Sequence, residues 1–152
     1  VVCVIGDGGM NMNIQELATI NRLGANIKIL VLNNHCYGIT VAYQKTNFEG
    51  RTEACTPETG YAPPNFGAVA DAYDLATIRI RSNAEMGEKI DDILEHPGPI
   101  ICDVDCGRYS EYAPKITGWN TPIEDQDSKL PREEFKANML IDPLPGWEKG
   151  EY

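Results

Sequence analysis

Between residues 1 and 105, two patterns of apolar and polar positions alternate along the chain. Short runs of β-branched and other apolar residues, bounded by glycine, proline or asparagine, are typical of strands buried in a parallel sheet. Longer segments repeat apolar residues at the spacing of one helix face, which predicts helices packed on that sheet. The predicted strands are 1–5, 27–32, 75–80 and 100–104, and the predicted helices are 11–23, 65–73 and 83–94.

The ends of these elements carry local signals. The run 1–5 is apolar throughout, so we expect a fully buried strand, followed by a turn at 6–9. Gly24 suits the end of the first helix, and Asn65 suits the N-cap of the second. The apolar residues of the third helix that are expected to face the core are Met86, Ile90, Ile93 and Leu94.

This alternation predicts an α/β fold with an open, mostly parallel sheet and helices on both faces. Residues 37–44 are predicted to form a short helix or turn, and residues 48–64 a loop. Asp103 and Asp105 are expected to be strand-end carboxylates that face solvent. Arg79 and Arg81, which alternate on one strand face, are expected to meet nearby carboxylates.

The last third of the chain has a different character. Residues 106–152 are polar and acidic, and prolines recur among them. We therefore predict an α/β domain at 1–105 and an irregular tail at 106–152, with one short helix near 132–139. Two interpretations of the tail stay open: a segment packed over the domain as a lid, and a partly mobile tail.

Composition narrows the class of protein. The chain has 23 carboxylates against 13 lysines and arginines, a net charge of −10, which disfavours a nucleic-acid partner. Five cysteines without a Cys-x-x-Cys pair indicate reduced thiols and a cytoplasmic protein, and they disfavour a zinc or iron–sulfur site. No apolar run is long enough to cross a membrane. Because the sequence opens inside an apolar strand without an initiator methionine, we expect a piece of a longer chain.

Two motifs follow the first two predicted strands. Gly6-Asp7-Gly8-Gly9 comes after one strand and Asn33-Asn34 after the next, and one helix plus one strand separates them. The carboxyl ends of parallel strands meet at one edge of a sheet, where ligands bind in folds of this class.

A carboxylate from Asp7 and an amide oxygen from Asn34 suit Mg²⁺, which prefers oxygen ligands and shares them with phosphate and water. A backbone carbonyl shortly after Asn34, that of Cys36, could supply a third ligand. Gly8 and Gly9 let the backbone approach a diphosphate. Either motif alone also fits ordinary turns and helix caps.

Together, the two motifs resemble the signature of thiamine-diphosphate-dependent enzymes. Residues 6–17 (GDGGMNMNIQEL) and 31–39 (VLNNHCYGI) further resemble the acetolactate synthase-like branch, in its C-terminal domain that binds the cofactor diphosphate. The resemblance runs from 1 to about 105, and the tail segments 122–125 and 131–135 are similar to C-termini in that branch.

The resemblance implies a role for each matching residue. Asp7 and Asn34 would bind Mg²⁺ through side chains and Cys36 through its carbonyl, with the Cys36 thiol incidental. Gly6, Gly8 and Gly9 would lie at the diphosphate, and the remaining residues along the cofactor would be Tyr37, Gly38 and Ile39. Where this branch commonly has a tryptophan between two glutamines, the chain has Ala42-Tyr43-Gln44, so Tyr43 is the candidate for the substrate pocket and the acceptor stays open.

The implied enzyme decarboxylates a 2-oxoacid such as pyruvate and transfers the two-carbon or acyl unit, as a homodimer or homotetramer. Its activating glutamate belongs to another domain, so the fragment alone is expected to be inactive; Glu16 is predicted to have a surface or packing role. Two alternatives stay open: the cofactor-binding part of a 2-oxoacid oxidoreductase or decarboxylase, and a non-catalytic cofactor-binding subunit.

Overall fold

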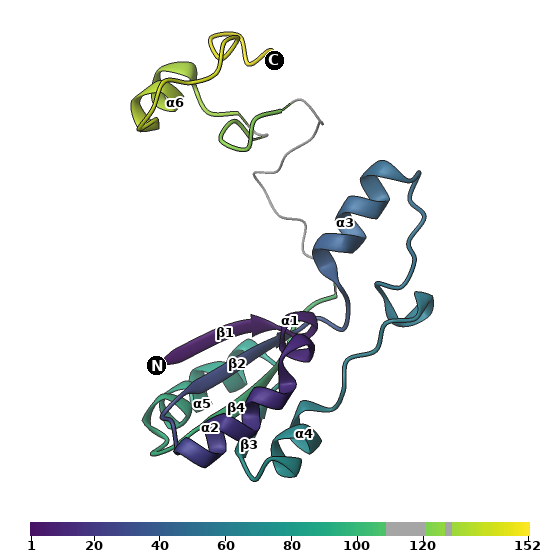
Figure 1. Cartoon of the computed structure of the whole chain (residues 1–152), viewed down its shortest axis with the longest axis vertical. Coiled ribbons are helices and arrows are strands. Elements are labelled where there is room, and N and C mark those ends of the chain that lie inside the picture. Colours follow the sequence, from purple (N-terminus) through teal and green to yellow (C-terminus); the bar gives the residue numbers. More distant parts are fainter. Residues whose placement is uncertain (109–120, 127–128) are drawn as a thin grey trace. The chain divides into compact units, whose positions relative to one another are not determined.

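The computed structural model describes residues 1–108, 121–126 and 129–152. The chain divides into two compact units, Val1–Ser110 and Glu111–Tyr152 (Figure 1). Among the described residues, no helix combines the length and the apolar character needed to span a bilayer.

The first unit is built on a parallel sheet. Within its described residues, the strands β1 (Val2–Gly6), β2 (Lys28–Asn33), β3 (Ala76–Ile80) and β4 (Ile100–Asp105) form one four-stranded sheet in the order β1-β2-β4-β3. All three neighbouring pairs are parallel. The predicted open parallel sheet is therefore confirmed, with β2 and β4 at its centre.

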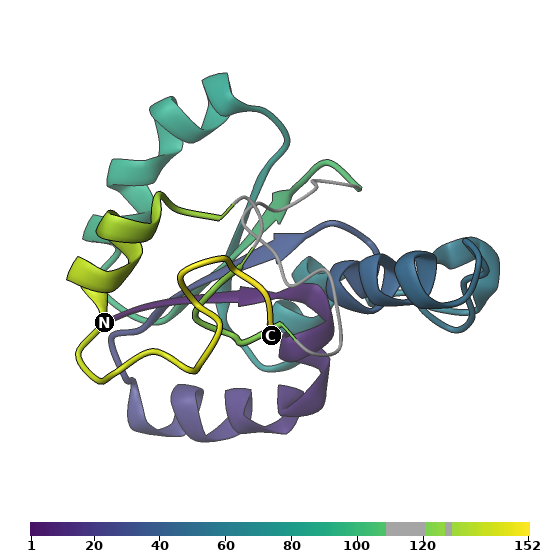
Figure 2. The ribbon, with the colours of Figure 1, turned by 90° about the horizontal axis from the view of Figure 1, so that it is seen from above.

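Helices cover both faces of this sheet, as predicted (Figure 2). Successive side chains of β2 point to opposite faces. Ile29 and Val31 pack on the side of α1 (Asp7–Met12), α2 (Leu17–Leu23) and α4 (Phe66–Ala72), in one apolar cluster with Leu17 and Phe66. Leu30 packs on the other side, in a cluster with Ile93 of α5 (Asn83–Glu95).

The prediction of a fully buried first strand was wrong. Val2 is 51% and Val4 61% exposed, while Cys3 and Ile5 pack on the cluster beneath α1 and α2. The reason is the position of β1 at the edge of the sheet: α5 packs on β3 and not on this edge. A continuous apolar run shows that a strand exists but does not show which of its faces a helix covers.

The first helix also differs from its prediction. It begins at Asp7, directly after Gly6, instead of at Asn11. The helical stretch is then interrupted at Asn13, whose φ is −133°, and continues through a 3₁₀ turn, Ile14–Glu16, into α2. Gly24 ends α2 in the left-handed region at φ 56°, as predicted.

The other helices follow their predicted ranges closely. Asn65 caps α4 by accepting hydrogen bonds from the backbone N–H groups of Gly67 and Ala68 at 3.0 and 3.3 Å. In α5 Ile93 is buried, but Leu94 is 45% exposed, which contradicts its predicted core position. Ile93 and Leu94 point about 100° apart around the helix, so Leu94 lies toward the margin of the face that Ile93 buries. The segment 37–44 becomes α3 (Gly38–Asn47), and 48–64 remains a loop apart from the 3₁₀ turn Pro57–Thr59.

Lys28 holds the amino end of the sheet together. It is 3% exposed, and its Nζ donates to Asn26 Oδ1 and to the carbonyl oxygens of His96 and Gly98, the last at 2.8 Å. The start of β2 is thereby joined to the turn that leads into β4.

Substitution of Lys28 by alanine is expected to lower the free energy of unfolding by about 1–3 kcal/mol, because buried carbonyl oxygens lose their donor. Chemical denaturation measures this change. Arg22→Ala, at an exposed position on α2, is the control and should change stability by less than about 0.5 kcal/mol. Equal losses in the two variants would contradict the role of Lys28.

The second unit has its own small set of contacts around α6 (Arg132–Asn138), which falls in the segment where the sequence predicts a short helix. Asp125 is 1% exposed and accepts two hydrogen bonds from the Arg132 guanidinium, at 2.9 and 3.0 Å, and one from the Tyr152 hydroxyl at 2.6 Å. Those bonds hold the pKa of Asp125 below its usual range. The ring of Phe135 lies 6.1 Å from that of Trp147, so this part of the tail is packed.

Candidate functional site

The two predicted motifs lie at the same edge of the sheet. Strands β1 and β2 are neighbours, and Gly6 pairs with Leu32 in their parallel register. Asp7 therefore follows β1, and Asn34 follows β2, at the same carboxyl end. This placement is the condition on which a shared metal site depends, since strand ends at opposite edges could not share an ion.

Asp7 is a buried carboxylate that its own chain leaves partly unpaired. It is 2% exposed, and its Oδ2 has no hydrogen-bond partner among the described residues. Burial raises the pKa of Asp7, and the backbone N–H of Gly8 and the neighbouring Tyr61 hydroxyl offset only part of that rise. A buried charged oxygen without a donor is costly. It is, however, well suited to a cation, so the residue fits the metal that the sequence predicts.

The loop after β2 lies beside Asp7. Asn34 is half-buried, and its Oδ1 accepts from the backbone N–H of Cys36 at 3.3 Å. Burial, and next the negative charge of Asp7, raises the pKa of the Cys36 thiol. That thiol donates to the carbonyl oxygen of Arg108 at 3.3 Å. The side chain of Cys36 therefore has a structural contact of its own. Its backbone carbonyl accepts from the N–H of Gly38 at 3.0 Å and keeps a second lone pair, which is the one to consider for a metal ion.

Gly8 makes close contact between the first helix and this loop. A Cβ atom placed on Gly8 would lie 2.3 Å from Cε1 of Tyr37, far inside van der Waals contact. At Gly9 the same atom would lie 3.1 Å from Cγ1 of Ile5, whereas at Gly6 it would meet nothing within 4 Å. The tertiary structure thus requires a glycine at position 8 because the Tyr37 ring occupies the space of a side chain.

Tyr61 is a site residue that the sequence did not indicate. It comes from the segment predicted as a loop, is 6% exposed, and its ring lies 4.1 Å from that of Tyr37. Its hydroxyl completes no hydrogen bond of good geometry in the described part of the chain, but it lies near enough to Asp7 to lower the pKa of that carboxylate. Burial and the nearby charge of Asp7 raise the pKa of this hydroxyl. No residue pattern in the loop could have announced it, because only folding brings it beside Asp7.

The remaining predicted residues lie on or near α3. Gly38 starts this helix close to Asn34, whose Nδ2 would be 3.0 Å from a Cβ atom at position 38. Ile39 is 77% exposed, and Tyr43 is 47% exposed with its ring in an edge contact with Phe48 at 6.0 Å. Glu16, by contrast, lies exposed in the 3₁₀ turn before α2.

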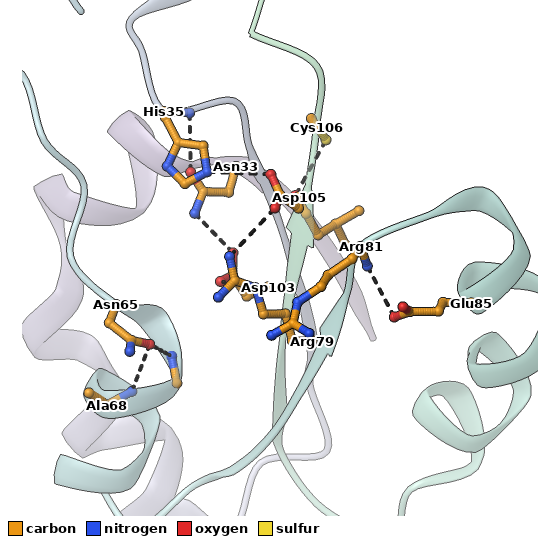
Figure 3. Close-up of polar contacts among 12 residues, drawn as sticks. Asn33, His35, Asn65, Ala68, Arg79, Arg81, Glu85, Asp103, Asp105 and Cys106 are labelled. Atoms are coloured by element: carbon orange, nitrogen blue, oxygen red, sulfur yellow. Dashed lines mark hydrogen bonds and ion pairs between the residues drawn. The ribbon is translucent and has the colours of Figure 1, made fainter. Parts of the chain in front are cut away.

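Asp103 does not face solvent as predicted. It is 5% exposed, and its Oδ1 accepts from Asn33 Nδ2 at 3.0 Å, while Arg79 Nε lies 3.7 Å from its Oδ2 (Figure 3). The predicted contact of Arg79 with carboxylates is confirmed. Asp103 lies, with Ile101, on the α4 side of β4, where the Asn33 side chain contacts it.

Across residues 1–108, 121–126 and 129–152, no three histidine, cysteine, aspartate or glutamate side chains gather in a way that could hold a metal ion. A cation beside Asp7 would therefore draw its other ligands from the amide of Asn34, a backbone carbonyl and its own bound molecules. Mg²⁺ commonly binds in that manner.

Comparison with known proteins places this site in context. Residues 1–104 match the family described as thiamine pyrophosphate enzyme, C-terminal TPP binding domain. The acetolactate synthase of Arthrospira platensis is 34% identical over 116 residues, which are 76% of this chain and 20% of that protein. The mitochondrial acetolactate synthase of Schizosaccharomyces pombe is 28% identical over 118 residues, 78% of this chain and 17% of that protein.

Among solved structures, the fold is similar to that of the Rhodococcus jostii RHA1 thiamine diphosphate-dependent 4-hydroxybenzoylformate decarboxylase. The TM-score is 0.64 at 22% identity, over 73% of this chain and 20% of that one. The chain thus spans about a fifth of the length of these relatives.

Proposed function

The chain belongs to the thiamine pyrophosphate enzyme family, in its C-terminal TPP-binding domain, and from this premise we propose that it binds thiamine diphosphate through a Mg²⁺ ion held by Asp7, Asn34 and the carbonyl of Cys36. The observation that carries the proposal is the buried, unpaired Oδ2 of Asp7 beside the loop that contains Asn34 and Cys36.

Each group has a distinct part in binding. Asp7 supplies the charged oxygen and Asn34 a neutral one, so the ion keeps enough positive charge to hold a diphosphate. The backbone N–H groups of Gly8 and Gly9, in the first turn of α1, would donate to the diphosphate. The Gly8 N–H, which bonds Asp7 in the ligand-free chain, would be released to the diphosphate when the ion takes that carboxylate. Tyr37, Gly38 and Ile39 lie along the cofactor; Ile39 is exposed in the chain by itself, as a residue that contacts a ligand would be.

When bound, thiamine diphosphate supplies the nucleophilic carbon and the electron sink for cleaving a bond next to a carbonyl group. We propose that the longer protein is an acetolactate synthase-like enzyme that decarboxylates a 2-oxoacid such as pyruvate and transfers the two-carbon or acyl unit. The support is the similarity to acetolactate synthases, at 34% identity for that of Arthrospira platensis. Tyr43 would line the acceptor pocket, and assembly as a homodimer or homotetramer in the cytoplasm is part of the proposal.

The test is calorimetric titration of the full-length protein with thiamine diphosphate, with and without Mg²⁺. We expect saturable binding that disappears when the ion is removed by a chelator, and pyruvate turnover by the full-length protein but not by residues 1–152 alone. Binding that does not depend on a divalent ion would contradict the metal site. Normal turnover by the 152-residue chain would contradict the proposal that its activating glutamate lies elsewhere.

A further inference from the structure

The two asparagines at the end of β2 lie in different environments. Asn33 is 2% exposed, and both ends of its amide are used: Nδ2 donates to Asp103 Oδ1 at 3.0 Å, and Oδ1 accepts from the backbone N–H of His35 at 3.2 Å (Figure 3). Asn34 is half-buried, and within the described residues its side chain bonds to the N–H of Cys36. The first asparagine therefore serves the fold, and the second remains available to a ligand.

Asp103 is also contacted from the neighbouring strand β3, on the side away from Asn33. Arg79 of β3 lies with Nε 3.7 Å from Asp103 Oδ2 and with Nη2 3.5 Å from Asp105 Oδ2. The backbone N–H of Cys106 also donates to the Asn33 carbonyl at 2.8 Å. The carboxyl ends of β2, β4 and β3 are thus linked through a chain of side chains that ends at Asn33.

This linkage fixes an unfavourable backbone conformation. His35 has φ 57°, in the left-handed region that residues other than glycine adopt at a cost. Its N–H is bound by Asn33, and its Nε2 lies 3.4 Å from Asp105 Oδ1. The reversal of the chain at His35 sets the course of the loop from Asn34 to Cys36, which lies next to Asp7.

We propose that Asn33 and Asp103 are positioning residues for the metal and cofactor site. They touch neither ligand; they hold the turn at His35 so that Asn34 and the Cys36 carbonyl meet an ion bound to Asp7. The inference rests on the proposed function, since it concerns the geometry of that same site. Residues that orient metal ligands typically change affinity about 10- to 100-fold when they are removed.

The experiment compares Asn33→Asp with the exchange Asn33→Asp plus Asp103→Asn in the full-length protein. The single substitution places two carboxylates face to face, which repel. The exchange restores the hydrogen bond with donor and acceptor reversed, and it leaves an oxygen at position 33 for the N–H of His35. The dissociation constant for Mg²⁺ at saturating thiamine diphosphate should rise about 10- to 100-fold in the single variant. In the exchanged pair it should return to within about twofold of the original.

Two controls distinguish a positioning role of Asn33 from a general effect on stability. They are the melting temperature of the ligand-free protein and the variant Lys28→Ala. Lys28 lies at the other end of β2, so its substitution should lower the melting temperature and leave Mg²⁺ affinity unchanged. The inference is overturned if Asn33→Asp behaves like Lys28→Ala, or if the exchange does not restore affinity. Absence of Mg²⁺-dependent binding in the unsubstituted protein would instead reject the proposed function, and the inference with it.

Discussion

Asp7→Asn is expected to weaken Mg²⁺-dependent binding of thiamine diphosphate by more than about 100-fold, because removing a charged metal ligand should exceed the effect of losing a residue that only orients one. The side chain keeps its shape, so the loss would report on charge at the metal and not on packing. Titration calorimetry in the presence of Mg²⁺ measures the change. Asp71→Asn, which removes the same charge from an exposed position on α4, should leave affinity unaltered.

The same substitution should raise the stability of the ligand-free protein, by about 1–3 kcal/mol at neutral pH, since a buried carboxylate oxygen without a donor disappears. The sign follows from the raised pKa of Asp7 in the folded state. The folded protein holds this proton more tightly than the unfolded chain does. Stability from this group is therefore present at low pH and is lost as pH rises from the ordinary aspartate range through the raised pKa. The amide of the Asp7→Asn variant does not titrate, so chemical denaturation across pH should show a smaller loss in the variant, and an unchanged pH dependence would contradict the assignment.

Gly8→Ala is expected to destabilise the protein by about 1–3 kcal/mol, because the new Cβ atom overlaps the Tyr37 ring and forces the loop away from α1. Cofactor affinity should fall more than about tenfold, as the loop carries two of the proposed metal ligands. Thermal unfolding of the ligand-free protein and calorimetric titration give the two quantities separately.

Two further variants test whether the contact with Tyr37 is the cause. Gly87→Ala in α5, where the added atom meets nothing within 4 Å, should stabilise the helix by about 0.5–1 kcal/mol. Combining Gly8→Ala with Tyr37→Ala should cost less stability than the sum of the two single changes, because the space for the methyl group is then open. Simple additivity would show that the cost at position 8 arises elsewhere.

Local sequence patterns were sufficient for the architecture. Short apolar runs separated by segments with helical periodicity predict parallel strands joined by helices. Two neighbouring parallel strands need a crossover of a dozen or more residues, and a helix supplies it. Gly24 and Asn65 marked helix ends through backbone chemistry that acts within a few residues. The same logic placed Asp7 and Asn34 at one edge, because both follow strands that run in the same direction. Membership of the thiamine pyrophosphate enzyme family was also indicated by these two motifs.

Burial, by contrast, depends on strand order and on which helix covers which face. The sequence predicted Val2 and Val4 to be core residues, but they are exposed because β1 is an edge strand. It predicted Asp103 to face solvent, but this residue is buried beside Asn33. The hydrogen bond between Asn33 and Asp103 joins residues 70 positions apart, and no local pattern encodes it.

The sequence by itself thus determined the parallel α/β fold, the two motifs and the edge of the sheet where they meet, because strand direction and helix length follow from short-range periodicity. Only the tertiary structure decided which asparagine serves the fold, that Tyr37 requires glycine at position 8, and that Tyr61 lies beside Asp7. These features arise from contacts between segments that are distant in the chain. The register of the sheet and the packing of the loop decide which residues of those segments meet.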